Sequence, residues 1–259
     1  MRPRRRPAPI HHPDHMNRRH VFLLSLALIS FASTPAAAQN PAEDSLWAGS
    51  AEVSAVATSG NSDTRTFGLG GELTYDPSGW SWRARAAYVE TSADDLLRAR
   101  SFNGLAEASR NLKDQLEVYG RGGYLRDLFA GIERRVTTEG GLAWEAIAGA
   151  PHSLQILVGG GVTREIRLVG DDLTIGTANA TGRYVLTLSD TSKITEEASF
   201  VGDLNTGENW RIANEVAATA TLTRLFSLKV SHKLSYLNAP VPGFKSTDTI
   251  SSAALVATF

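Results

Sequence analysis

Apolar and polar residues alternate along much of the chain, and residues 226–237 show the pattern most clearly. In the stretch FSLKVSHKLSYL, large apolar or aromatic residues occupy almost every second position, and serine or lysine stands between them. Successive side chains of a strand point to opposite faces, so a period of two indicates a β-strand with one apolar and one polar face. His232 falls in the apolar row of this predicted strand.

The same period recurs between turn signals over the rest of the chain and predicts twelve strands. Every proline after residue 39 falls outside them, as expected because proline has no N–H to donate to a sheet. The predicted strands are 46–58, 64–75, 80–91, 98–111, 115–126, 133–146, 153–166, 173–187, 193–203, 209–223, 226–237 and 246–259.

The connections between these strands alternate in length. Tight turns are predicted at 76–79, 111–114, 150–152, 189–192 and 223–225, and mostly longer links at 91–97, 127–132, 168–172, 204–208 and 238–245. An even number of antiparallel strands with short turns at one end and longer loops at the other is typical of bacterial outer-membrane barrels. The predicted fold class is therefore all-β: a membrane-spanning antiparallel up-and-down β-barrel of about twelve strands, with both termini periplasmic.

Aromatic residues support a membrane location because they gather near the two ends of the predicted strands. Tryptophan and tyrosine are enriched at the two membrane interfaces, where they form girdles around a barrel. The residues predicted at the short-turn end are Trp47, Tyr75, Trp80, Trp82, Trp144 and Phe259, and those at the loop end are Tyr88, Tyr124, Trp210 and Tyr236. Outer-membrane lipids and lipopolysaccharide are the partners expected for such a wall.

The N-terminal residues have the pattern of a secretory signal peptide. Residues 1–20 are rich in arginine, Val21–Phe31 is apolar, and Ala36–Ala38 provides small residues for cleavage. The apolar run is too short to span a bilayer as a helix. We therefore expect residues 1–38 to be removed and residues 39–259 to form the barrel domain in the outer membrane. Met16 is an alternative start codon, in which case residues 1–15 would not be translated.

Charge and cysteine content exclude several classes of function. The full chain carries a formal net charge of −1, and removal of residues 1–38 leaves 20 basic and 26 acidic residues, a net charge of −6. No basic patch argues for nucleic-acid binding, and the chain has no cysteine for disulfides or thiolate chemistry. The two histidines beyond residue 38, His152 and His232, are far apart, so we expect no metal site and no cofactor.

Several segments resemble one known family. Residues 47–75 combine a Trp-initiated strand, the turn Ser59-Gly60-Asn61-Ser62-Asp63-Thr64 and a second alternating strand, and Gly141-Leu142-Ala143-Trp144-Glu145 and the terminal Phe259 follow later. These segments are similar to the salt-induced outer-membrane proteins, the YdiY-like family defined as a domain of unknown function. The resemblance covers essentially residues 39–259 and implies an outer-membrane barrel without an established activity. Phe259 also resembles the C-terminal signal that the barrel-assembly machinery recognises.

The polar faces of the predicted strands carry charges of both signs. These side chains either pair across the lumen and close it, or line a narrow passage for small solutes or ions in an osmotic or salt response. Both alternatives stay open, because barrels of about eight strands are filled by side chains, porins of about 16–18 strands enclose a channel, and twelve strands lie between these cases. Glycine and alanine at other inward positions either leave space or permit strong curvature. The lumen-lining candidates are Glu52, Glu72, Arg83, Arg85, Glu107, Glu117, Arg121, Glu139, Glu197, Arg211, Glu215, Lys229 and Lys233.

A lipid hydrolase is the third hypothesis, because Ser231 and His232 are adjacent in the sequence. Adjacent residues of a strand point to opposite faces, so these two cannot form a nucleophile and base pair without a bulge. We therefore predict that the protein is not an enzyme and that His232 faces lipid, with a hydrogen bond to a neighbouring strand.

Overall fold

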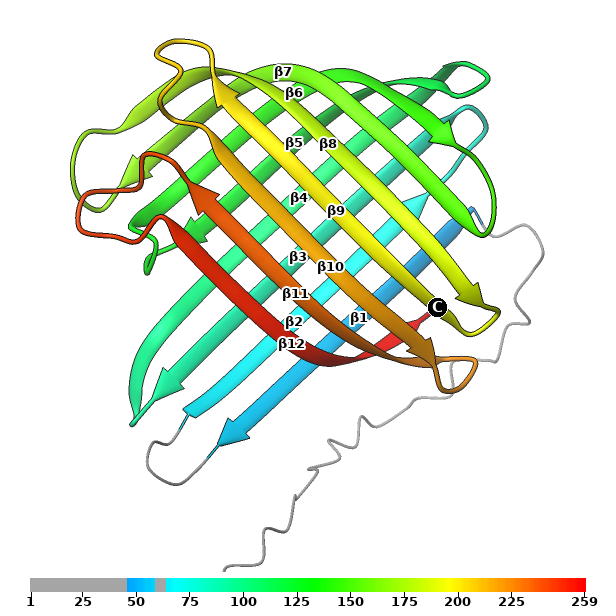
Figure 1. Cartoon of the computed structure of the whole chain (residues 1–259), viewed down its shortest axis with the longest axis horizontal. Helices are drawn as coiled ribbons and strands as arrows, with labels where there is room; N and C mark the ends of the chain where they lie inside the picture. The colour runs from blue at the N-terminus through cyan, green and yellow to red at the C-terminus, as the bar shows by residue number, and fades with distance from the viewer. Residues whose placement is uncertain (1–45, 59–63) are drawn as a thin grey trace, which may run out of the picture. The chain divides into compact units, whose positions relative to one another are not determined.

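The computed structural model describes residues 46–58 and 64–259, which form a closed antiparallel barrel (Figure 1). Each strand pairs with its neighbours in sequence, and β1 pairs with β12 to close the ring. The predicted signal peptide and the turn at 59–63 lie outside the described residues. The strands are β1 Trp47–Thr58, β2 Thr64–Tyr75, β3 Trp80–Ala93, β4 Leu96–Lys113, β5 Leu116–Asp127, β6 Ile132–Ile147, β7 His152–Arg167, β8 Leu173–Ser189, β9 Ser192–Asp203, β10 Arg211–Thr221, β11 Phe226–Leu237 and β12 Thr247–Thr258.

All twelve predicted strands are confirmed, and their ends differ from the predictions by a few residues. The predicted long link at 91–97 is wrong: β3 continues to Ala93, β4 begins at Leu96, and only Asp94 and Asp95 lie between them. Both residues have positive φ angles, of 51° and 58°. Two consecutive residues with positive φ fit a tight hairpin turn, and aspartate tolerates that conformation better than most residues do.

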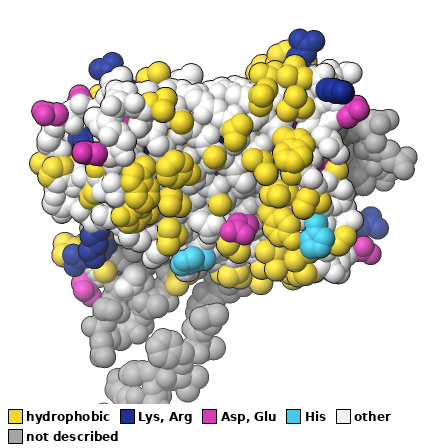
Figure 2. All heavy atoms as spheres, turned by 45° about the horizontal axis from the view of Figure 1, so that its top comes forward, with side chains coloured by type: hydrophobic (Ala, Val, Ile, Leu, Met, Phe, Trp, Pro, Cys, Tyr) yellow, Lys and Arg dark blue, Asp and Glu magenta, His cyan; other side chains and the backbone are white. Residues whose placement is uncertain are grey.

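The outer wall of the barrel is apolar, as a membrane-spanning protein requires. Large apolar side chains on it are 40–54% exposed, for example Val53, Leu69, Val158 and Val230. In Figure 2, apolar side chains cover much of the wall, and lysine, arginine, aspartate and glutamate lie mainly toward the two ends. Within the described residues, no helix is long and apolar enough to cross a membrane.

Aromatic side chains stack in groups at both ends of the wall. Trp47 stacks on Tyr75 with 4.2 Å between ring centroids, and Trp80 stacks on Trp82 at 5.9 Å. At the loop end, Phe102 contacts Tyr124, and Trp210 lies between Phe200 and Tyr236. These groups have the placement expected of two membrane-interface girdles.

The last residue completes the seam between β1 and β12. The backbone of Phe259 exchanges two hydrogen bonds with Gly49, of 2.8 and 3.0 Å. Its ring also lies against Gly49, where an added Cβ would approach the ring to 2.5 Å. Glycine at position 49 thus leaves room for the terminal ring against the outer wall.

Candidate functional site

The interior of the barrel holds every residue predicted to line the lumen. Their side chains alternate with the apolar outer residues of the same strands. Most of them contact a charged partner on another strand, either the neighbouring strand or one across the interior. The thirteen residues are distributed over β1, β2, β3, β4, β5, β6, β9, β10 and β11.

Ion pairs cross the interior between strands that are not neighbours. Arg183 of β8 donates to both carboxylate oxygens of Glu107 of β4, at 2.8 Å each. Arg183 also contacts Glu197 of β9 at 3.3 Å, and Arg121 of β5 lies 3.9 Å from Glu107. Because β5, β6 and β7 separate β4 from β8 around the ring, the pair between Glu107 and Arg183 spans the lumen.

A second crossing joins opposite sides of the wall, since β3 and β9 lie six strands apart in either direction around the ring. Arg83 and Arg85 of β3 approach Glu197 at 4.0 and 3.7 Å, and they donate to Glu72 of β2 at 2.8 and 3.0 Å. The two crossings form one array of alternating charges, which we call the cross-lumen network. Its members are Glu72, Arg83, Arg85, Glu107, Arg121, Glu139, Arg183 and Glu197.

Side chains fill the lumen beside β4–β8. Arg121 donates to Glu139 at 2.8 and 3.0 Å, and the Tyr119 hydroxyl donates to Asn179 at 2.9 Å. The side chains of Glu107, Arg121 and Glu139 are only 8–10% exposed. Tyr119, Ala143 and Leu157 form a buried apolar cluster here. These side chains leave a cavity of about 150 Å³ among them, lined by Glu107, Tyr119, Ala143 and Leu157 together with residues that include Glu117.

The side of the lumen beside β10–β2 is wetter. Lys229 donates to Glu52 at 3.1 Å and to Glu215 at 3.4 Å, and these three side chains are 24%, 32% and 34% exposed. Because they lie on the inner face of a closed wall, only solvent inside the lumen reaches them. Gly70 makes room for Glu52, since a Cβ there would lie 2.5 Å from the carboxylate oxygen.

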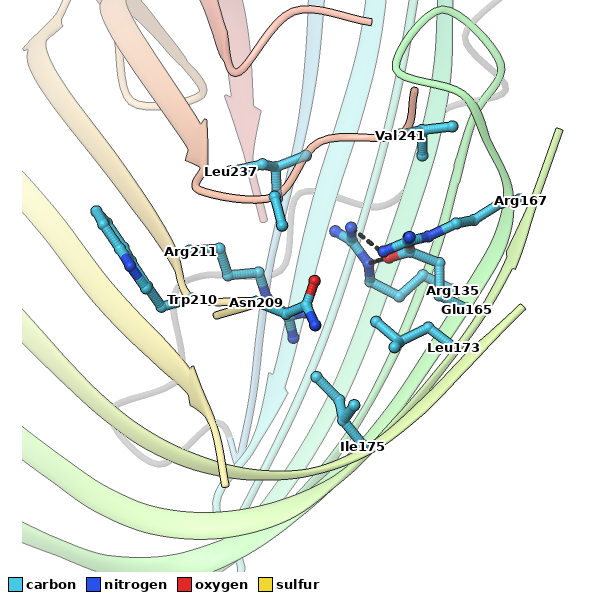
Figure 3. A pocket seen from close by; sticks show the side chains of 11 residues that line it. Arg135, Glu165, Arg167, Leu173, Ile175, Asn209, Trp210, Arg211, Leu237 and Val241 are labelled. Carbon is cyan, nitrogen blue, oxygen red and sulfur yellow. Dashed lines mark hydrogen bonds and ion pairs between the residues drawn. The ribbon is translucent and has the colours of Figure 1, made fainter. Parts of the chain in front are cut away.

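The loop between β11 and β12 folds over the loop end of the lumen. Val241 of this loop is 2% exposed and packs with Ala130 and Ile132, next to Leu125 and Phe244. Beneath it lies a cavity of about 20 Å³ lined by Arg135, Glu165, Arg167 and Arg211, among others (Figure 3). A charged site therefore lies beneath an apolar contact at the loop end of the lumen.

Four functional candidates were missing from the sequence-based set: Arg135, Glu165, Arg167 and Arg183. Each lies in the inward phase of its strand, so the period of two could have identified them. Their partners on distant strands, in contrast, depend on how the ring closes. No sequence spacing indicates that Arg183 meets Glu107.

His232 lies on the outer wall, as the alternation predicted, near the middle of β11. Its Nδ1 is 2.8 Å from the hydroxyl of Ser251 of β12, whereas Ser231 points inward and bonds Ser252 at 2.9 Å. The adjacent Ser231 and His232 are therefore not a nucleophile and base pair. The part of the chain that the structure describes holds no group of three or more acidic or histidine side chains arranged to bind a metal.

Comparisons with known proteins give one family and several barrels. The model of a family described as protein of unknown function, DUF481, matches residues 51–259. The uncharacterized protein YdiY of Escherichia coli (strain K12) is 24% identical over 206 residues, which cover 80% of this chain and 78% of the relative. The NanC porin is 11% identical with a TM-score of 0.47, over 82% of this chain and 97% of the porin. The translocator domain of autotransporter NalP from Neisseria meningitidis is 13% identical with a TM-score of 0.43, over 82% and 86%.

Proposed function

This chain belongs to the DUF481 family of proteins of unknown function, the YdiY-like family that its sequence resembles, and we propose that it forms a narrow passive channel for small solutes or ions in the bacterial outer membrane. The observation that carries the proposal is the solvent exposure of Glu52, Glu215 and Lys229 inside a closed wall. Charged groups with solvent on the inner face are what a wet passage requires, whereas a filled interior would bury them.

The cross-lumen network sets an upper limit on what passes. Its crossings between β4 and β8 and between β3 and β9 occupy the centre of the lumen, so a passage runs beside them, along β10–β2. Both signs of charge line this route, as Glu52 and Lys229 illustrate. We therefore expect small conductance steps and exclusion of bulky solutes.

Placement in the outer membrane draws support from the wall and from the chain end. The apolar wall with aromatic groups at both ends matches a bilayer, and Phe259 ends a strand that seals the barrel. We propose that β12 presents this residue to the barrel-assembly machinery. At the loop end the outward side chains of Arg126, Arg134 and Arg164 are exposed, and arginine suits contact with lipopolysaccharide phosphates. A role in salt response rests on the family resemblance, and growth of a deletion strain in high salt tests it.

The channel is tested by conductance in planar bilayers with a matched pair of variants. Ala213 lies inward, two residues before Glu215, and Ala218 lies on the outer face of the same strand. Ala213→Trp places a large ring in the proposed passage and is expected to reduce the single-channel conductance. Ala218→Trp places the same ring in lipid, and it should conduct like the unmodified protein.

Silence of the unmodified protein over a range of salt and voltage would favour the alternative of a closed structural barrel. Equal conductance of the Ala213→Trp and Ala218→Trp variants would place the conducting route elsewhere. Faster migration of unboiled samples on a gel identifies folded barrels before either comparison is made.

A further inference from the structure

Three arginines surround the small cavity beneath the β11–β12 loop (Figure 3). Arg135 of β6 and Arg167 of β7 donate to Glu165 at 2.6 and 2.7 Å. Arg211 of β10 extends toward this group from the other side, and its guanidinium donates to the hydroxyl of Thr163 at 3.2 Å. The side chains of Glu165, Arg135 and Arg167 are 3%, 11% and 15% exposed, so their charges are largely withdrawn from water.

The charges at this cavity do not balance. Glu165 is the acidic residue in its lining, and it is shared by Arg135 and Arg167. Within the described residues, Arg211 has no carboxylate at ion-pair distance, and its hydrogen-bond partner Thr163 is neutral. In the cross-lumen network, by contrast, every guanidinium has a carboxylate partner.

A cation that is withdrawn from water without an anionic partner lowers the stability of the fold strongly. The same cost arises when an ion pair in the interior loses its carboxylate. An anion between the guanidinium groups would restore the balance. Planar guanidinium groups offer several N–H donors to such an anion in a fixed geometry. The cavity thus has the charge and the donors of an anion site.

The size of the cavity limits the ligand. Its volume of about 20 Å³ compares with roughly 10–15 Å³ for a single water on the same kind of measure. An ion of halide size fits this space, while a larger polyatomic anion would have to displace Val241 and its loop. Val241 and Leu237 close the site from above and limit its hydration.

We propose that Arg135, Arg167 and Arg211 bind a small inorganic anion of halide size at this cavity. On the basis of the channel proposed above, Arg211 of β10 borders the passage along β10–β2, so the site favours anions over cations there. The anion bridges β6, β7 and β10, so its binding also stabilises the folded barrel.

Thermal unfolding in detergent tests binding without any need for conduction. The midpoint is measured in sodium chloride and in sodium gluconate at equal ionic strength, because gluconate is too large for the site. The unmodified protein is expected to unfold at a higher temperature in chloride, and Arg211→Gln is expected to lose that difference. Arg211→Lys keeps the charge and should retain at least part of it.

Arg164→Gln is the matched control, because it removes the same charge from the outer face of β7, one residue from Glu165. This variant is expected to keep the full chloride effect. An unmodified protein with equal midpoints in the two salts, or an Arg211→Gln variant that keeps the difference, would overturn the anion site. Gel migration of unboiled samples identifies variants that fail to fold.

Selectivity is measured separately, as the reversal potential across a potassium chloride gradient. The unmodified channel should favour chloride, and Arg211→Gln should shift the potential toward potassium. A barrel that binds chloride but does not conduct would contradict the proposed channel and leave the anion site intact. A conducting barrel without chloride-dependent stability would contradict the anion site alone.

Discussion

Individual glycines decide how closely the strands of this barrel approach one another. At Gly159 an added Cβ would lie 2.4 Å from the carbonyl oxygen of Gly140 and 2.7 Å from the Tyr119 hydroxyl. At Gly161 it would lie 2.1 Å from the carbonyl oxygen of Thr138. These inward glycines allow β6 and β7 to approach closely, and Gly159 also makes room for the Tyr119 hydroxyl. The space beside them is therefore occupied and is not part of an open lumen.

A methyl group at position 159 is therefore expected to be destabilising. Gly159→Ala should lower the free energy of unfolding by about 1–3 kcal/mol, as overpacking of a tight interior does. Gly182→Ala is the control, because nothing lies within 4 Å of a Cβ there. Urea unfolding in detergent measures both, and equal stability of the two variants would contradict the tight contact at Gly159.

His232 is a polar residue on the apolar outer wall. His232→Leu removes its bond to Ser251, worth about 0.5–1.5 kcal/mol, but places an apolar side chain in lipid. We expect a free energy of unfolding within about 1 kcal/mol of the unmodified protein. Fatty-acid release from phospholipid vesicles should be at background for both proteins; release that depends on His232 would revive the hydrolase hypothesis.

At the scale of elements, strands are defined by local pattern and loops by contacts. The stretch 226–237 was predicted with the bounds of β11, because each step of its alternation is local. The β11–β12 loop, in contrast, is held by Val241 against Ala130 and Ile132 of the β5–β6 connection and β6. No local signal marks a single valine of a loop as a contact with a hairpin more than a hundred residues earlier.

Release of this loop should widen the loop end of the lumen. Val241→Ser replaces the apolar side chain that packs on Ala130 and Ile132 with a smaller polar one, which weakens this contact. Serine adds no charge beside the arginines that line the cavity below. We expect a larger or noisier conductance than that of the unmodified channel, measured in planar bilayers. Pro242→Ser, at the exposed neighbouring position of the same loop, is the control and should leave the conductance unchanged.

At the scale of the whole molecule, ion pairs across the lumen hold strands that share no backbone hydrogen bonds. Arg183 and Glu107 are 16% and 9% exposed, and Arg83 and Arg85 reach Glu197 on the opposite wall. Removing one partner of an ion pair that is withdrawn from water lowers the stability strongly, because the other charge stays unpaired. An exposed ion pair contributes little to stability. The network therefore makes the shape of the barrel sensitive to single charge deletions.

Arg183→Met is expected to lower the free energy of unfolding by about 3–5 kcal/mol, because Glu107 loses its bidentate partner in a poorly hydrated interior. Arg100→Met is the matched control: Arg100 pairs with Glu90 on the outer wall, where the two side chains are 49% and 36% exposed. That variant should lose less than about 1 kcal/mol. Similar losses in urea unfolding would show that the cross-lumen pair is no more important than a surface pair.

The sequence by itself determined the strands, their faces and the aromatic ends, because a period of two and the positions of turn residues are local properties of the chain. It also placed Glu52, Arg83 and Lys229 on the polar face. Tertiary structure alone decided which charges meet across the lumen, where solvent remains and where Arg211 lacks a carboxylate. Those features depend on the register and curvature of a closed ring, which bring together residues as far apart in the sequence as Glu107 and Arg183. The alternation of polar and apolar residues does not encode which distant strands face each other.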